Sequence, residues 1–431
     1  MPPRRPAPPL HLAETIAVGS ELLVGGRTDS NSLRIAEEFG RLGIAVRFKS
    51  IVGDDRRDIR SAVATAAGRA GVIVLTGGLG PTVDDCTREA IANVTGRRLA
   101  RRKEAFEALK ARLAEWGRTP NAGQRRQALI PAGATVISNP VGSAPGFWMK
   151  WNGALLVSLP GVPWEMEAML RDSITTLLTS ELTRARMRPS PITRLVFHTF
   201  GLPEAEVDAK LKGLIKPGTP VDLGLLAAPT GVLVSLTTRP SPALSGPRLQ
   251  RLAEGVRSRL RDWLYAEGPE SMEEVVGRLL TSQHKTVAVA ESCTGGLIGH
   301  RLTQVPGSSA YVDRGVICYS NQAKIDLLGV PPSLIERHGA VSAEVASAMA
   351  QGMRERSGVS VALSVTGIAG PGGATATKPV GLVYLGLDAE DGRSIAKEYR
   401  FSGDRTVVKQ RASQAALDVL RRWLLDQAAL G

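Results

Sequence analysis

Apolar runs alternate with amphipathic stretches over the first part of the chain. The runs are short and rich in β-branched residues, as in buried strands, whereas the stretches between them carry apolar residues at helical spacing. The expected strands are residues 15–19, 44–52 and 71–78, and the expected helices are residues 31–42, 58–70 and 84–94. Strands and helices that alternate at this spacing predict a parallel sheet covered by helices on both faces. Ligands of such sheets bind where the carboxyl ends of the strands meet the loops.

Two further changes in the pattern divide the chain. The pattern next predicts a charged helix over residues 101–116, two strands, and a helix over residues 164–182. The segment ELTRARMRPSPIT then breaks the periodicity with charged residues and two prolines. The next block, residues 194–265, predicts the order strand, helix, strand, strand, helix. It ends at AEGPES, where Ser271 and Glu274 predict a capping box at the start of a new helix.

The last block restarts the alternation of helices and strands and closes with a helix from Asp404. We therefore expect an α/β protein in which a small α+β domain joins two three-layer α/β/α domains. The expected limits are a disordered tail over residues 1–12 and domains over 13–185, 190–266 and 270–431. A chain of 431 residues is long enough for about three domains with substantial cores.

Composition narrows the function classes. The only cysteines are Cys86, Cys293 and Cys318, with no CxxC pair, which argues against a disulfide framework or a thiolate zinc site. No run of about 18 apolar residues occurs and the N-terminus lacks a continuous apolar segment, so we expect a cytoplasmic protein with no membrane partner. The net charge of +13 suits a binder of anionic small molecules. The lack of basic runs with interleaved aromatic residues argues against a nucleic-acid partner.

Two loops of the first block carry candidate ligands for an anion. VGSELLVGGRTDSNS follows the first strand, TGGLGPTVDDCTREA follows the third, and each leads into a helix N-terminus, where free amide groups favour a phosphate. The candidate binding residues are Glu21, Asn31, Gly77, Gly78, Gly80 and Thr82. Asp84 and Asp85 could hold a divalent metal that neutralises a pyrophosphate, or they could simply cap the helix. The turns NPVGSAPGFW and LPGVPWEM could complete the wall of a pocket.

These loops resemble the molybdopterin-binding-like domain that opens CinA proteins, a fold shared with molybdenum-cofactor biosynthesis enzymes of the MoaB and MogA type. The resemblance implies a metal-dependent ADP-ribose pyrophosphatase that uses Mg²⁺ or a Co²⁺, Mn²⁺ or Ni²⁺ ion, with K⁺ as an additional ion. No glutamate box of the Nudix type is present, so the attacking water would be activated in another way. A pterin- or nucleotide-binding role without catalysis is the alternative.

The order of elements in residues 194–265 is similar to that of the KH-like domain of CinA proteins. A KH module that binds nucleic acid needs a GxxG loop to clamp the backbone, and this block has none. We therefore expect a spacer or a dimerisation element rather than a nucleic-acid reader.

The last block concentrates hydroxyl groups at the ends of predicted strands. The stretch AESCTGGLIGH places Ser292, Thr294 and Gly295 between a strand and a helix, where helix amide groups could bind an oxyanion or a carboxamide. Later turns add the candidates Ser309, Tyr319, Lys324, Thr366, Gly367 and Arg405. None of the histidines of this block falls in these turns, which argues against a Ser-His-Asp triad.

A serine and a lysine suffice for amide hydrolysis without a metal. The serine hydroxyl needs a base, and a partly desolvated lysine can serve because burial lowers its pKa. Tyr319 could relay the proton or orient the lysine, and Arg405 could bind a substrate phosphate. Cys293 competes as the nucleophile, since a helix N-terminus would lower its pKa. Glu291 could position the turn or reach the substrate, and the sequence leaves both roles open.

The segment from Met272 to the C-terminus resembles the CinA C-terminal domain, the PncC family of nicotinamide-nucleotide amidases. The matching motifs are AESCTGG, PGSSAY, YSNQAK, HGAVS, VTGIAGPGG, KPVGLVY and GDR. The resemblance implies hydrolysis of nicotinamide mononucleotide (NMN) to nicotinate mononucleotide and ammonia, with no cofactor, in a homodimer. Its functional residues fall on Ser292, Ser309, Tyr319, Lys324, Thr366 and Arg405. One position departs, because Gln322 stands where glutamate is common. A binding protein related to competence or DNA damage is the alternative.

Overall fold

The computed structural model describes residues 8–188, 190–238 and 246–430. Within these residues the chain forms two compact units. The first contains the residues up to 193 together with 237–238, and the second contains residues 194–236 and those from 246 onward. The middle block therefore packs with the last block in one unit.

The first unit is built on a six-stranded sheet with the strand order β2-β1-β3-β8-β7-β6. The strands are β1 (Leu12–Val18), β2 (Ala45–Val52), β3 (Val72–Thr76), β6 (Thr135–Ile137), β7 (Gly146–Trp151) and β8 (Ala154–Leu159). Strands β2, β1, β3 and β8 run parallel, which confirms the predicted parallel arrangement. β7 pairs antiparallel with β8, and β6 pairs antiparallel with β7. The short strands β4 (Leu99–Arg101) and β5 (Leu129–Pro131) pair separately.

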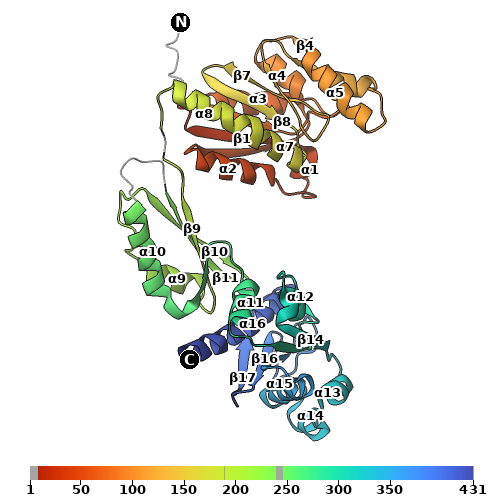
Figure 1. The fold of residues 1–431 in the computed structure, drawn as a ribbon, viewed down its shortest axis with the longest axis vertical. Helices are drawn as coiled ribbons and strands as arrows, with labels where there is room; N and C mark the ends of the chain where they lie inside the picture. Colours follow the sequence, from red (N-terminus) through yellow and green to blue (C-terminus); the bar gives the residue numbers. More distant parts are fainter. Residues whose placement is uncertain (1–7, 189, 239–245, 431) are drawn as a thin grey trace. The chain divides into compact units, whose positions relative to one another are not determined.

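Helices cover both faces of this sheet (Figure 1). Along β3, Ile73 and Leu75 belong to one buried cluster and Val72 and Val74 to the other, because successive side chains of a strand point to opposite faces. The first cluster includes residues of α3 (Arg56–Ala67) and α4 (Thr87–Val94), and the second includes residues of α2 (Asn31–Arg41), α7 (Pro163–Met169) and α8 (Thr175–Arg184). The remaining helices are α1 (Ser20–Leu23), α5 (Lys103–Glu115) and α6 (Ala122–Arg126).

The predicted helix over residues 164–182 is not continuous. It consists of α7 and α8 with one turn of π-helix, Leu170–Ile174, between them. Met166, Met169, Ile174 and Leu178 stay buried on the same side, so the wider turn keeps the apolar stripe facing the sheet.

The middle block forms a four-stranded sheet with the order β10-β11-β9-β12. Its elements are β9 (Arg194–Thr199), α9 (Glu204–Leu211), β10 (Val221–Ala228), β11 (Gly231–Thr238), α10 (Gly246–Leu260) and β12 (Leu264–Glu267). The predicted order is confirmed up to α10, and β12 adds a strand that pairs antiparallel with β9. Phe200 and Tyr265 of this block pack against the core of the last block, which explains why the two share one unit.

The last block has a five-stranded sheet with the order β14-β13-β15-β16-β17. The strands are β13 (Val287–Glu291), β14 (Val312–Ile317), β15 (Val361–Gly367), β16 (Leu382–Ala389) and β17 (Ser394–Arg400). Strands β14, β13 and β15 run parallel to one another. β16 pairs antiparallel with β15 and with β17. α11 (Met272–Ser282), α12 (Leu297–Thr303) and α16 (Arg405–Leu430) cover one face, and α13 (Asn321–Leu328), α14 (Pro332–His338) and α15 (Ala343–Ser357) cover the other (Figure 1). The chain is thus two three-layer α/β/α arrangements joined by a small α+β block, as predicted.

The structure confirms the predicted start of the last block. Ser271 accepts a hydrogen bond from the amide of Glu274, and the Glu274 carboxylate accepts one from the amide of Ser271, which is a capping box. Among the described helices, none combines the length and the apolar composition that crossing a membrane requires.

Candidate active site

Three parallel strands of the last block end side by side. Glu291, the last residue of β13, pairs with Ile317 of β14 on one side and with Val365 of β15 on the other. The residues that follow these strands therefore meet at one edge of the sheet, as expected for a ligand site of this fold. They include Ser292 after β13 and Tyr319 after β14.

A buried serine and lysine contact each other at this edge. The Nζ atom of Lys324 donates hydrogen bonds to Ser292 Oγ at 3.1 Å, to the Cys318 carbonyl at 2.9 Å and to the Tyr319 carbonyl at 3.3 Å. Lys324 is 1% exposed and Ser292 7% exposed. Ser320 caps α13 by accepting from the amide of Ala323, which fixes the first turn of the helix that carries the lysine.

Burial lowers the pKa of Lys324. A desolvated ammonium is costly, and no carboxylate within ion-pair distance offsets that cost among the described residues. The neutral amine is the form that can take a proton from a hydroxyl. Because the pKa of Lys324 is lowered, its neutral amine forms at a lower pH than that of an ordinary lysine, and this makes Lys324 a candidate base for Ser292.

Ser292 and Lys324 lie in the wall of a cavity of about 200 Å³. The other lining residues are Cys293, Tyr319, Asn321, Ala340, Val341, Thr366, Gly367, Ala369 and Arg405. Of the sequence candidates, the structure thus brings seven together: Ser292, Cys293, Tyr319, Lys324, Thr366, Gly367 and Arg405. The sequence reasoning missed Asn321, although it stands in the YSNQAK motif one turn before Lys324, and it missed Ala340 and Val341 of the HGAVS motif.

Arg405 holds the rim of the cavity together. One guanidinium nitrogen donates to the Gly370 carbonyl at 2.7 Å and the other to the Tyr319 hydroxyl at 3.1 Å. The Tyr319 hydroxyl is therefore engaged with Arg405, whereas its carbonyl accepts from Lys324. Tyr319 was predicted either to relay the proton or to orient the lysine. This geometry fits the second role, because the main-chain carbonyl of Tyr319 accepts a hydrogen bond from Lys324. Thr366 donates to the Ala340 carbonyl at 2.8 Å and so ties β15 to another wall of the cavity.

Three candidates do not line the cavity, and their predicted roles in substrate contact stay predictions. Ser309 is exposed in the turn before β14, at the amino end of a parallel strand, and the carboxyl ends that build the cavity lie at the opposite edge of the sheet. Thr294 is fully buried, and Gly295 is exposed beyond it. The chain turns away from the cavity here because Gly295 and Gly296 have left-handed φ values of 61° and 92°.

The structure decides between the two roles of Glu291. Its carboxylate accepts hydrogen bonds from the amides of Gly296, Ile298 and Gly299. Glu291 therefore positions the turn and does not line the cavity. This corrects the predicted oxyanion site, because the amide groups at the start of α12 bind a carboxylate of the protein itself.

Cys293 is a poor competitor for Ser292. Burial raises the pKa of the Cys293 thiol to about 12, opposite to the lowering expected from the helix N-terminus. The thiol lies in the hydrophobic core, where desolvation of a thiolate outweighs the field of a short helix whose amides already face Glu291. A hydroxyl paired with an amine is therefore the nucleophile that this geometry favours.

The predicted loops of the first unit meet at one edge of its sheet. Asn31, after β1, donates to the Gly161 carbonyl after β8 at 2.8 Å, and the amide of Gly77, after β3, donates to the Leu159 carbonyl. Gly77 has a φ of 102°, and a Cβ atom there would lie 2.1 Å from the Val18 carbonyl oxygen, so only glycine fits this crossing. Glu21 is exposed in α1, the short helix that follows β1.

Asp85 closes the loop that carries the other candidates. Its carboxylate accepts hydrogen bonds from the amide and the hydroxyl of Thr82 and lies against Gly80. The helix that was predicted from residue 84 begins at Thr87, so neither aspartate caps it. Gly78, the remaining candidate of this loop, packs against the Thr87 side chain, which donates to the Gly77 carbonyl at 2.9 Å.

Asp84 is exposed. Within the described residues, no group of three or more His, Cys, Asp or Glu side chains is arranged to hold a metal ion. A divalent cation held by Asp84 and Asp85 would therefore have to take its other ligands from water and from substrate phosphates.

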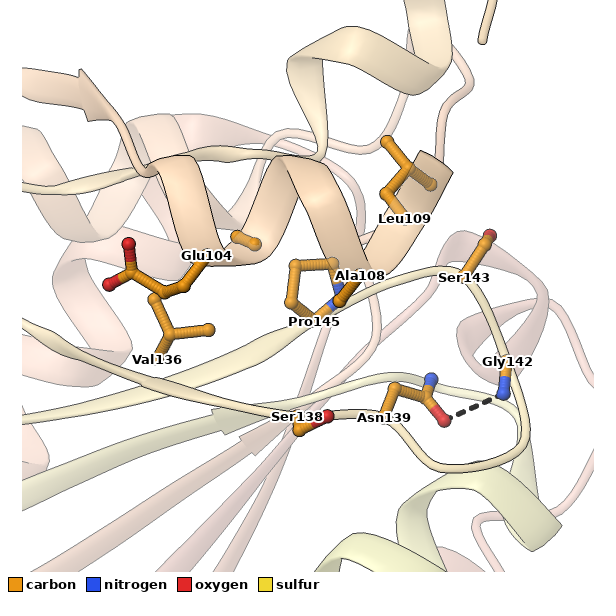
Figure 2. Close-up of a pocket in the computed structure, with 10 residues that line it drawn as sticks. Glu104, Ala108, Leu109, Val136, Ser138, Asn139, Gly142, Ser143 and Pro145 are labelled. Atoms are coloured by element: carbon orange, nitrogen blue, oxygen red, sulfur yellow. Dashed lines mark hydrogen bonds between the residues drawn. The ribbon is translucent and has the colours of Figure 1, made fainter. Parts of the chain in front are cut away.

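The first unit also has a cleft of about 220 Å³, and the turn NPVGSAPGFW, which was predicted to complete the wall of a pocket, lines it in part (Figure 2). One wall comes from α5, with Glu104, Ala105, Ala108 and Leu109, and the other comes from Val136, Ser138 and the first part of NPVGSAPGFW. The side chain of Asn139 accepts from the amide of Gly142 at 2.8 Å, as Figure 2 shows. Asn139 also donates to Glu165 of α7 at 2.6 Å, and burial raises the pKa of Glu165. None of the candidate site residues lines this cleft.

Comparisons with known proteins cover all three blocks. Family models match residues 14–180 as a probable molybdopterin binding domain, residues 194–266 as a damage-inducible protein CinA KH domain and residues 269–424 as a CinA C-terminal domain. A CinA-like protein of Geotalea uraniireducens is 41% identical over 413 residues, which cover 96% of this chain and 97% of that protein. A putative competence-damage inducible protein of Caldicellulosiruptor bescii is 41% identical over 423 residues, 96% of this chain and 100% of its own.

Solved structures match parts of the chain. The competence/damage inducible protein CihA of Agrobacterium tumefaciens is 44% identical over 36% of this chain and 97% of its own, with a TM-score of 0.35. Because full-length relatives match at about 40% identity from end to end, the chain belongs to the CinA family.

Proposed function

We propose that the last block hydrolyses the carboxamide of NMN to nicotinate mononucleotide and ammonia. The observation that carries this proposal is the buried contact of 3.1 Å between Lys324 Nζ and Ser292 Oγ in the wall of a cavity. A serine beside a desolvated lysine is an activated nucleophile for an amide carbon. The resemblance to nicotinamide-nucleotide amidases supplies the substrate.

The proposed reaction proceeds in two halves. Neutral Lys324 takes the proton of Ser292, and Ser292 Oγ bonds to the carboxamide carbon. When the carbon–nitrogen bond breaks, Lys324 returns the proton and ammonia leaves. Water then attacks the ester of Ser292 with Lys324 again as the base, which releases the carboxylate product and restores the hydroxyl. The carbonyls of Cys318 and Tyr319 hold the amine in place throughout.

The cavity accommodates only part of the nucleotide. At about 200 Å³ it is smaller than pockets that enclose a complete drug-sized ligand. We propose that the nicotinamide ring enters and that the ribose phosphate stays at the rim, where Arg405 supplies positive charge. Because Arg405 already bonds Gly370 and Tyr319, it links phosphate binding to the shape of the opening.

Ammonia release from NMN in the presence of EDTA tests the proposal. We expect release by the purified full chain at a rate that EDTA does not change, with nicotinate mononucleotide as the second product by mass spectrometry. A folded protein that releases no ammonia would remove the amidase assignment and favour the competence- or damage-related binding protein.

The pH dependence of the amidase is expected to report the lowered pKa of Lys324. Because the neutral amine is the base, kcat/KM should rise with pH and level off below the range where an ordinary lysine titrates. Measuring kcat/KM across neutral and alkaline pH, with a check that the protein stays folded, tests this. A rate that falls with pH over this interval, or rises only where free lysine titrates, would contradict a buried lysine base.

For the first unit we propose hydrolysis of ADP-ribose at the edge where the loops after β1, β3 and β8 meet. A divalent ion bound there would neutralise charge on the diphosphate. The chain contributes glycine-rich backbone in the loop after β3 and the carboxylates of Asp84 and Asp85. Pterin or nucleotide binding without hydrolysis is the alternative.

Asp84 offers the cleaner test of this activity, because Asp85 also closes its own loop through Thr82. We expect Asp84→Asn to lower metal-dependent ADP-ribose hydrolysis roughly 100-fold while thermal stability changes little. Asp172→Asn, at an exposed aspartate of the same unit, is the matched control and should keep the wild-type rate. If wild type binds ADP-ribose by calorimetry but does not cleave it, the binding role replaces the enzymatic one.

A further inference from the structure

Glu291 is a buried carboxylate that has no cationic partner among the described residues. The residue is 1% exposed, and no Lys, Arg or His of the described chain forms an ion pair with it. Its partners are backbone amides: Oε2 accepts from Gly296 at 3.0 Å and Ile298 at 3.1 Å, and Oε1 accepts from Gly299 at 2.8 Å. Burying an ionised carboxylate is expensive unless hydrogen bonds satisfy it. These bonds satisfy both of its oxygens from one turn of the chain.

The turn that Glu291 binds starts at Ser292. Between the serine and α12 lie Gly295 and Gly296, whose left-handed conformations have no side chain to restrain them. The side chain of Glu291 accepts from amides at the end of this segment, and Glu291 itself directly precedes the segment, so its carboxylate closes the segment into a loop. Glycines give the turn its shape, and the three bonds from Glu291 hold it there.

The main chain of Glu291 helps to fix Lys324, the partner of Ser292. Its carbonyl accepts from the amide of Cys318 at 2.8 Å, and the carbonyl of Cys318 accepts from Lys324 Nζ at 2.9 Å. The amide of Ser292 donates to the Val365 carbonyl at 3.0 Å. One residue is therefore bonded to the turn that follows the nucleophile and, through Cys318, to the segment that holds the base.

We propose that Glu291 is a positioning residue that sets the separation of Ser292 Oγ and Lys324 Nζ by clamping the turn after the serine. The inference rests on the proposed amidase function. Glu291 acts through Ser292 and does not touch substrate, because it does not line the cavity. A misplacement of reacting groups by about 1 Å is enough to lower a rate roughly 100-fold.

Replacing Glu291 by glutamine separates positioning from other effects. The amide oxygen keeps one acceptor, but the NH₂ group faces backbone N–H donors and cannot accept from them. We expect Glu291→Gln to lower kcat roughly 10- to 100-fold, with KM for NMN changed by less than about threefold. The pH at which the rate levels off should stay the same, because burial is the main cause of the lowered pKa of Lys324 and Glu291 is not among the groups that shift it.

Glu274→Gln is the matched control. Glu274 also caps a helix of the last block, by accepting from the amide of Ser271, but it is exposed and does not line the cavity. Both variants should lose thermal stability, and only Glu291→Gln should lose kcat. If Glu291→Gln does not fold, Glu291→Asp, whose shorter side chain cannot span the same three amides, is measured in the same way. A folded Glu291 variant with wild-type kcat would overturn the inference.

A second measurement does not depend on NMN. Phenylmethanesulfonyl fluoride labels an activated serine: Ser292 Oγ bonds to sulfur, fluoride leaves and Lys324 takes the proton. We expect mass spectrometry to show slower labelling in Glu291→Gln than in wild type and Glu274→Gln. If wild type releases no ammonia but the labelling rates still differ in this way, Glu291 is retained as the positioning residue and NMN is rejected as the substrate. A wild type that neither releases ammonia nor becomes labelled would overturn both proposals.

Discussion

Replacing Lys324 by methionine is expected to lower ammonia release from NMN by roughly 10³-fold. The substitution keeps the length and most of the volume of the side chain but removes the nitrogen that lies 3.1 Å from Ser292 Oγ. Without it, the described residues around the hydroxyl offer no other base within hydrogen-bond distance, so the serine stays protonated and a weak nucleophile. Single-turnover kinetics at saturating NMN measure the effect on the chemical step itself.

Stability makes this variant informative. Methionine leaves the carbonyls of Cys318 and Tyr319 without their donor, which costs about 1–3 kcal/mol for each group that stays unsatisfied. It also removes an amine whose charged form burial disfavours, an effect of opposite sign. We therefore expect a small change in Tm, so that the lost rate reflects lost chemistry and not unfolding.

The control for Lys324→Met is a lysine at the other end of the same sheet. Lys285 stands just before β13, pairs with Glu390 and is remote from the carboxyl ends that form the cavity. Lys285→Met should leave ammonia release within about twofold of wild type. If Lys324→Met retains activity close to that of this control, the lysine is not the base and the proposed mechanism fails.

The parts of the fold that could be predicted are those that leave a periodic trace. Val72 to Leu75 are apolar at every position because helices bury both faces of β3, and such a run bounded by glycine is readable without a structure. The capping box at Ser271 and Glu274 is equally local. β12 was missed because its four residues, LYAE, carry no strand-like alternation and owe their state to pairing with β9.

The site was predicted less completely, because a motif gives the position of a residue in the sequence and not the edge of the sheet on which it lies. Ser309 and Lys324 both flank β14, yet only the residue after the strand reaches the cavity. The pKa of Cys293 depends on the burial that the whole core imposes, and a helix N-terminus in the sequence could not reveal that Glu291 already occupies it. The cleft at Asn139 needs α5 beside a turn some thirty residues later in the chain. The homodimer and the metal ion stay predictions.

Ser292→Ala and Cys293→Ala are expected to differ more than any other pair of neighbouring substitutions in the chain. Removing the hydroxyl that Lys324 contacts should lower ammonia release roughly 10³- to 10⁶-fold, as loss of a covalent nucleophile does in serine hydrolases. Removing the thiol of Cys293 should leave the rate within about threefold of wild type, because burial raises its pKa to about 12 and keeps it protonated.

The two variants also separate a catalytic effect from a packing effect. Cys293 lies in the core with Val289 and Ile298, so its truncation should lower Tm more than Ser292→Ala does. Activity and stability are thus expected to change in opposite order: the serine variant stable and inactive, the cysteine variant destabilised and active. Trapping the acyl intermediate from NMN and mapping it by mass spectrometry would place the ester on Ser292. A thioester on Cys293, or an inactive Cys293→Ala with a normal Tm, would transfer the nucleophile to the thiol and leave Lys324 as its base.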